Sequence, residues 1–184
     1  MAANDNFVIT GKRVGLRHPC EADVTQFIAL NRASARLHRG LVSPPKSADE
    51  FKSYLEFSHR DDCQSFLISQ LTDSAIVGSI TLSQIFLRRF RSAYLGYYIG
   101  ERYSNRGYMT EALQLILRFA FQTLKLHRVE ANIQPGNVPS IALVKRAGFT
   151  QEGYSKRYLK ISGRWRDHER WALLAENWKS VTAE

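Results

Sequence analysis

The chain has 184 residues, of which 44% are hydrophobic and 23% charged, and this composition excludes a disordered polypeptide and fits one domain with a buried core. Its longest apolar stretches are far too short to span a membrane, and residues 1–6 lack the basic and apolar regions of a secretory signal. The formal net charge of +9 points to a polyanionic partner, such as nucleic acid, an anionic cofactor or the ribosome surface.

The first third of the chain predicts one strand followed by two helices. Residues 13–17 alternate apolar and polar side chains, which is the pattern of a half-buried strand. Apolar residues recur at helical spacing after the turn at Pro19, so a helix is expected there. Ser47 and Glu50 form a capping box, which predicts a second helix over Ala48–His59.

Extended patterns dominate the middle of the chain. Residues 64–69 and 76–82 alternate on either side of a turn at 72–74, and we expect them to pair as a hairpin. Residues 93–99 form another strand-like run. Gly96 lies inside this run, where a glycine often marks a bulge or the close approach of another group.

A cluster of arginines lies between two of these strand-like runs, at Arg88, Arg89 and Arg91. Such a cluster can be an ordinary solvated surface, or it can be a loop that contacts an anionic surface. The sequence leaves both interpretations open.

The last part of the chain contains the strongest helical pattern. Residues 109–124 carry a broad apolar face, and residues 139–147 fit a short helix that ends at Gly148. The remaining strands are predicted at 128–134, 154–161 and 169–174. The fold class is therefore mixed α/β (α+β), in one domain over residues 1–184.

Cys20 and Cys63 are the only two cysteines, and neither belongs to a CxxC motif. This usage fits a reducing compartment and offers no metal site. We expect a cytoplasmic protein with no metal cofactor, present as a monomer or a homodimer.

The segment from Arg102 to Ala112 links the 93–99 strand to the strongest helix. A helix N-terminus presents unpaired backbone N–H groups and a positive dipole end, and Gly107 leaves room for a pyrophosphate beside them. Arg102 and Arg106 would add charged contacts. An ordinary solvated turn is the alternative, because a single glycine between a strand and a helix is a weak signal.

A second segment, Asn137 to Phe149, is more specific. Together with the first it resembles the acetyl-coenzyme A signature of the GNAT acetyltransferase superfamily, matching the pattern N-x-x-S-x-x-L-x-x-x-x-G-F. From Ala93 to about Trp178 the chain is similar to the RimJ/RimL branch, the ribosomal-protein N-terminal acetyltransferases. That similarity includes the runs 152–154 and 163–168.

The resemblance implies a mostly antiparallel, twisted sheet of about seven strands, splayed in the middle and flanked by about four helices. Acetyl-CoA would enter the splay, its pantetheine arm lying along the 97–99 strand, with a backbone N–H near Ile99 stabilising the charge that grows on the thioester oxygen. The implied cofactor-binding residues are Tyr98, Ile99, Gly100, Arg102, Asn105, Arg106, Gly107, Tyr108, Met109, Thr110, Asn137, Ser140 and Lys145.

The chain departs from the family pattern at Asn105, where the loop usually has the first of two glycines. Asparagine is the non-glycine residue that best adopts left-handed backbone geometry, so the phosphate loop is expected to persist.

The resemblance also implies direct attack of an amine in a ternary complex, without an acyl-enzyme. Many relatives place a tyrosine where this chain has Val144, so Ser140 becomes the candidate that protonates the departing thiolate. The alternative role for Ser140 is helix capping after Asn137. Asn132 replaces the glutamate base of the RimI branch.

The candidate proton acceptors that remain are Glu101, Asp167 and His168, acting through water. Asp167 and His168 can instead be an exposed pair at a strand edge, and the three tryptophans are packing residues in the simplest interpretation.

The predicted acceptor is the N-terminal alanine of a small-subunit ribosomal protein. Two alternatives remain: a small-molecule amine such as a polyamine, an antibiotic or an amino acid, and a non-catalytic RNA- or ribosome-binding module. Ribosome association through the basic surface is a further expectation, and no membrane partner is expected.

Overall fold

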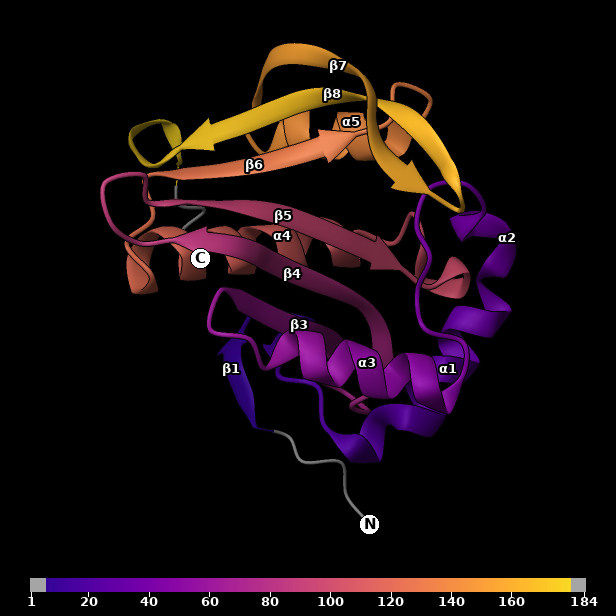
Figure 1. Cartoon of the computed structure of the whole chain (residues 1–184). Coiled ribbons are helices and arrows are strands. Elements are labelled where there is room, and N and C mark those ends of the chain that lie inside the picture. The colour runs from indigo at the N-terminus through magenta and orange to yellow at the C-terminus, as the bar shows by residue number, and fades with distance from the viewer. Residues whose placement is uncertain (1–5, 180–184) are drawn as a thin grey trace.

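The computed structural model describes residues 6–179, which fold around one sheet with the strand order β1-β2-β3-β4-β5-β6-β8-β7. Figure 1 shows helices on both faces of this sheet. The strands are β1 (Phe7–Thr10), β2 (Val14–Arg17), β3 (Cys63–Gln70), β4 (Ile76–Phe86), β5 (Ser92–Ile99), β6 (Arg128–Ile133), β7 (Thr150–Ile161) and β8 (Arg164–Leu174). The helices are α1 (Val24–Ala33), α2 (Ala35–His38), α3 (Ala48–Ser58), α4 (Tyr108–Arg118) and α5 (Val138–Arg146).

The predicted α/β class and the mostly antiparallel sheet are confirmed, with eight strands in place of about seven. The additional strand is β1, a four-residue edge strand too short to show a clear alternation. Both β7 and β8 begin earlier than predicted, at Thr150 and Arg164. Both strands contain many charged residues, so the alternation of apolar and polar side chains that predicts a strand is not visible at their beginnings.

The two helical layers follow from the burial pattern. On one face, α1 and α3 bury Phe27, Phe51 and Leu55. On the other, α4 buries a continuous apolar side that packs on β2 and β4. The predicted helix over 109–124 continues past α4 as a π-helical turn, Phe119–Thr123. Within residues 6–179, no helix is long and apolar enough to cross a membrane.

The middle of the sheet is splayed between β5 and β6. These two strands form the one parallel pair in the described sheet, and their register covers only Ser92–Tyr94 with Arg128–Glu130. Figure 1 shows both strands close together at their beginnings and diverging towards their ends. The carboxyl-terminal half of β5 therefore has one edge that is not covered by β6.

Gly96 lies in this uncovered half of β5. It pairs in continuous register with Thr81, so no bulge occurs there, and the shift in that strand pair lies between Ser83 and Phe86. A Cβ at Gly96 would meet nothing within 4 Å. The expected bulge is wrong, and no described residue lies close to the side of the glycine where a Cβ would stand, which borders open space. The docking of another group against this glycine stays a prediction.

Candidate active site

The loop between β5 and α4 has the backbone geometry of an anion-binding turn. Asn105 has φ 59° and Gly107, the N-cap of α4, has φ 80°, so both adopt the left-handed conformation. The first intrahelical bond of α4 runs from the Glu111 N–H to the Gly107 carbonyl at 3.1 Å. The N–H groups of Tyr108, Met109 and Thr110 precede that bond, and such first-turn groups have no intrahelical acceptor.

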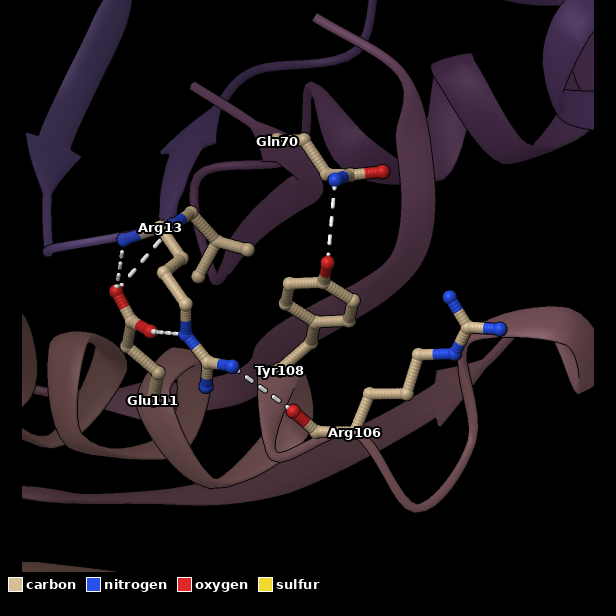
Figure 2. Close-up of polar contacts among 6 residues, drawn as sticks. Arg13, Gln70, Arg106, Tyr108 and Glu111 are labelled. Atoms are coloured by element: carbon tan, nitrogen blue, oxygen red, sulfur yellow. Dashed lines mark hydrogen bonds and ion pairs between the residues drawn. The ribbon is translucent and has the colours of Figure 1, made fainter. Parts of the chain in front are cut away.

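Arg13, directly before β2, holds this loop in place (Figure 2). Its Nη1 donates to the Arg106 carbonyl at 3.0 Å, and its Nε and backbone N–H donate to the Glu111 carboxylate at 3.1 and 2.7 Å. Burial by itself raises the pKa of Glu111, but these bonds and one from the Val14 N–H lower it below 4.5. An ionised Glu111 therefore links β2 to the first turn of α4.

Replacing Asn105 tests the left-handed turn. Asn105→Gly is expected to bind CoA within about twofold of the wild type, because glycine adopts this conformation without strain. Asn105→Val is expected to weaken CoA binding by about 5- to 30-fold, since left-handed geometry costs roughly 1–2 kcal/mol for a β-branched residue, whereas asparagine tolerates it. Calorimetric titration with CoA measures both. If the glycine variant loses as much affinity as the valine variant, the Asn105 side chain itself contacts the cofactor.

A cavity of about 590 Å³ lies between this loop, the end of β5 and the start of α5. It brings together eight of the predicted cofactor-binding residues: Tyr98, Ile99, Asn105, Gly107, Met109, Thr110, Asn137 and Ser140. On α5 the lining residues are Pro139, Ser140, Leu143 and Arg146, which share one face of the helix.

Five other predicted cofactor residues lie outside the lining of this cavity. Lys145 faces away from it, with its Nζ 5.3 Å from the Trp171 ring centre, and Arg146 takes the position at the cavity. The Arg102 guanidinium lies over the Tyr103 ring at 4.5 Å, and the Tyr108 hydroxyl accepts a bond from Gln70. The others are Gly100, which packs against Leu30, and Arg106, whose carbonyl binds Arg13.

The backbone of Ile99 faces the splay. Ile99 lies opposite Gly78 of β4. The next residue, Gly100, donates its N–H to the Val77 carbonyl at 2.8 Å. Ile99 and Gly78 are therefore a non-hydrogen-bonded pair. In such a pair the N–H and C=O groups point to the opposite edge. The N–H of Ile99 is therefore directed at the opening, where a bound thioester or amide could accept from it.

His38, at the end of α2, binds the other backbone group of Ile99. Its Nε2 lies 2.9 Å from the Ile99 carbonyl, so this nitrogen carries the proton and donates it. The imidazole is buried and meets Tyr98 edge to face. Burial lowers the pKa of His38 below its ordinary value of 6.5, and the side chain is neutral at physiological pH.

His38 is expected to make stability depend on pH. Its pKa is lower in the folded than in the unfolded chain, so below about pH 6.5 the unfolded chain takes up the proton first and the free energy of unfolding falls. Thermal unfolding measured from pH 8 to 5 is expected to show this loss in the wild type and a flatter profile in His38→Gln. The exposed His59→Gln is the control. An unchanged slope in His38→Gln would contradict the assignment.

A second cavity, of about 380 Å³, lies on the other side of the splay. Its lining comes from the last part of β4, the middle of β5, the end of β6 and the β7–β8 pair, and includes Gly96, Asn132 and His168. Five residues line both cavities: Leu41, Val42, Tyr97, Asn137 and Ser140. The two cavities therefore meet beside Ser140.

The start of α5 defines the surroundings of Ser140. Asn137 is the N-cap, and its side chain accepts the Ser140 N–H at 3.4 Å, so the cap is the asparagine and not the serine hydroxyl. The Tyr97 hydroxyl donates to the Ser140 carbonyl at 3.4 Å. Burial raises the pKa of Tyr97 to about 12, so this phenol stays protonated.

Of the three candidate proton acceptors, only His168 lines one of the two cavities. His168 is buried in the smaller cavity, and its Nδ1 lies 3.0 Å from the Arg166 carbonyl, which leaves Nε2 as the acceptor in the neutral ring. Asp167 accepts the Tyr154 hydroxyl and the Arg157 N–H. Glu101 lines neither cavity, and its carboxylate lies 3.6 Å from Arg36.

Sequence reasoning missed the contribution of the segment after α1. His38, Leu41 and Val42 enter the site from this segment, and Gln134 donates to the Gly40 carbonyl at 2.8 Å, which ties it to the end of β6. No motif marks these residues. Tyr97 was expected only as part of the 97–99 strand along which the pantetheine arm lies, and the position of its hydroxyl where the two cavities meet was not predicted.

Comparison with known proteins agrees with this geometry. The family model described as acetyltransferase (GNAT) domain matches residues 13–150. A probable N-acetyltransferase of Bacillus subtilis is 36% identical over 66% of this chain and 67% of that relative. The [ribosomal protein uS5]-alanine N-acetyltransferase of Escherichia coli is 37% identical over 67% of this chain and 63% of that relative.

A solved structure also has the same fold. RimJ of Mycobacterium smegmatis in complex with CoA-disulfide superposes with a TM-score of 0.80 at 30% identity, covering 89% of this chain and 82% of that chain. A more distant relative, spermidine N(1)-acetyltransferase of Vibrio cholerae, is 23% identical over 71% of this chain and 75% of that relative. The chain therefore belongs to the GNAT acetyltransferase family, as an acetyl-CoA-dependent N-acetyltransferase similar to the RimJ branch.

Proposed function

We propose that this protein transfers the acetyl group of acetyl-CoA to the α-amino group of an N-terminal alanine on a small-subunit ribosomal protein. The observation that carries the proposal is the pair of cavities that meet beside Ser140. In this assignment the larger cavity holds the cofactor and the smaller one receives the acceptor amine. The name of the Escherichia coli relative supports the choice of acceptor.

The residues of the larger cavity fit a CoA molecule. Left-handed Asn105 and Gly107 direct the turn towards the unpaired N–H groups of α4, which suits a pyrophosphate. A Cβ at residue 107 would meet the Arg13 guanidinium at 3.0 Å, and the backbone there has φ 80°, so this position of the turn favours glycine. When bound, acetyl-CoA supplies the activated thioester, and we assign to the Ile99 N–H the stabilisation of negative charge on its oxygen.

The smaller cavity favours a peptide amine over a polyamine. Within the described residues, neither cavity is lined by an aspartate or glutamate side chain. A polyamine carries several positive charges that such a lining does not compensate. A peptide α-amine has a pKa of roughly 7.7–8.0, against about 10.4 for lysine, so it is easily presented in its neutral, nucleophilic form.

Proton transfer is assigned to two side chains. His168 Nε2 accepts the proton that leaves the amine, directly or through water, and the Ser140 hydroxyl donates a proton to the departing thiolate. Proton exchange with water then reprotonates Ser140 and deprotonates His168, so both groups end as they began. The amine attacks without an acyl-enzyme, and no covalent nucleophile is required. Glu101 is the weaker candidate, because it is outside both cavities and paired with Arg36.

Acceptor peptides test the proposal. The purified protein is incubated with acetyl-CoA and matched peptides that begin with Ala, Ser or Lys, and with an α-N-blocked alanine peptide as control. We expect acetylation of the alanine peptide at its α-amine and none of the blocked peptide. The spermidine acetyltransferase among the relatives makes a small-molecule amine the second candidate. Acetylation of spermidine with no transfer to any peptide would establish that alternative.

A further inference from the structure

The loop between β4 and β5 exposes an unusual apolar surface. Phe86, Leu87 and Phe90 are 53%, 56% and 57% exposed, and the two phenylalanine rings lie 6.0 Å apart in an edge-to-face arrangement. Contiguous large apolar side chains at a surface mark contact sites in soluble proteins. We call residues 86–91 the tip loop.

The same loop is strongly basic. Arg88, Arg89 and Arg91 are exposed, and within residues 6–179 no ion pair involves any of the three. The backbone at the loop's end is held by its neighbour, since the Arg91 carbonyl accepts the N–H groups of His127 and Arg128 at 2.7 and 3.1 Å. The exposed arginine and phenylalanine side chains therefore lie together on a loop whose end is hydrogen-bonded to the start of β6.

The tip loop also lies next to the smaller cavity. Ser83, Gln84 and Tyr94, from the same β4–β5 hairpin, line that cavity. Figure 1 shows the loop at the left end of the hairpin, opposite to the end where β5 leads into the phosphate loop. A macromolecule on the tip loop would consequently lie near the cavity that is proposed to receive the acceptor.

We propose that the tip loop binds single-stranded RNA next to the acceptor polypeptide. Phenylalanine rings stack on unpaired bases, and arginine guanidinium groups both stack on bases and bond phosphates. The overall charge of +9 favours such a polyanion. The proposal rests on the proposed function, because a ribosomal-protein N-terminus is an acceptor presented beside RNA.

Other occupants fit less well. A second copy of the chain would bring two sets of three unpaired arginines together. An anionic bilayer satisfies the charge and the apolar groups, but it does not carry the acceptor that the neighbouring cavity is proposed to take. Vesicle binding is therefore an outcome of the test.

The experiment measures binding of the full chain to a fluorescent 20-nucleotide single-stranded RNA by anisotropy across a salt series. Arg88→Gln/Arg89→Gln is expected to lower affinity at least tenfold and to reduce the slope of log affinity against log salt by about 1.4. Phe86→Ala/Phe90→Ala is expected to lower affinity about tenfold with the slope unchanged, because stacking releases no counterions. Lys52→Gln/Lys156→Gln removes the same charge from exposed positions outside the tip loop and both cavities, and it is expected to bind like the wild type.

The outcomes separate this inference from the proposed function. All four proteins are expected to acetylate a free alanine peptide at the same rate, since the tip loop lines neither cavity. Three results would overturn the inference. The protein does not bind RNA; the tip-loop and control variants lose RNA affinity equally; or the tip loop is required for binding to phosphatidylserine vesicles and not to RNA. Tip-dependent RNA binding without peptide acetylation would uphold it and reject the proposed acceptor.

Discussion

Ser140→Ala is expected to lower kcat for peptide acetylation by about 100-fold while the affinity for CoA stays within about twofold. The serine lies where the two cavities meet, and its hydroxyl is assigned to protonating the departing thiolate. A group that acts mainly in the transition state changes turnover more than ground-state binding. Steady-state kinetics and calorimetric CoA titration measure the two quantities separately.

Two further variants make the Ser140 result specific. Ser58→Ala removes a hydroxyl from the end of α3, outside both cavities, and is expected to leave kcat unchanged. Tyr97→Phe removes the other hydroxyl at the junction, which donates to the Ser140 carbonyl. If Tyr97→Phe lowers kcat 100-fold and Ser140→Ala does not, the phenol is the acid and the assignment to serine is wrong.

Asp23→Ala is expected to lower the free energy of unfolding by about 3–5 kcal/mol, because it removes the carboxylate that forms a buried ion pair with the Arg17 guanidinium. The Asp23 carboxylate accepts both terminal nitrogens of Arg17, at 2.6 and 2.8 Å, and the Cys20 N–H at 2.9 Å. The two side chains are only 3% and 6% exposed. Denaturant unfolding followed by circular dichroism measures the loss.

An exposed pair provides the matched control for Asp23. Asp62→Ala breaks a contact with Arg60 on the surface, and its unfolding midpoint is expected to match that of the wild type. Burial raises the pKa of Asp23, but the bonds from Arg17 and Cys20 outweigh it and lower the value below 3.8. The stability from this pair is therefore expected at neutral pH and to be lost as the pH falls below about 3.8. Equal midpoints for Asp23→Ala and the wild type would contradict a buried, charged pair.

Local chemistry made much of the fold predictable. The capping box at Ser47 and Glu50 located the start of α3, and the apolar spacing of 109–124 located α4 with its continuation. The left-handed turn expected at Asn105 is present, with φ 59°. Each of these features depends on residues close together in the chain, so a single sequence contains the necessary information.

Only the tertiary structure decided which distant groups meet. Arg13 contacts the phosphate loop from 93 residues away, and His38 reaches Ile99 across 61 residues. Such contacts depend on the register and twist of the sheet and on how each helix packs, and no local pattern encodes them. Helix rotation likewise decided that Arg146, and not Lys145, lines the larger cavity.

The sequence by itself therefore determined the order of the helices and strands apart from β1 and α2, the left-handed loop before α4 and the resemblance carried by Asn137 to Phe149. The tertiary structure decided that two cavities without acidic lining meet beside Ser140, and that the arginines at 88–91 share their loop with exposed phenylalanines. The physical reason is the range of the interactions. Hydrogen bonding in turns and side-chain periodicity act over a few residues, whereas a cavity is formed by side chains that only long-range packing brings together.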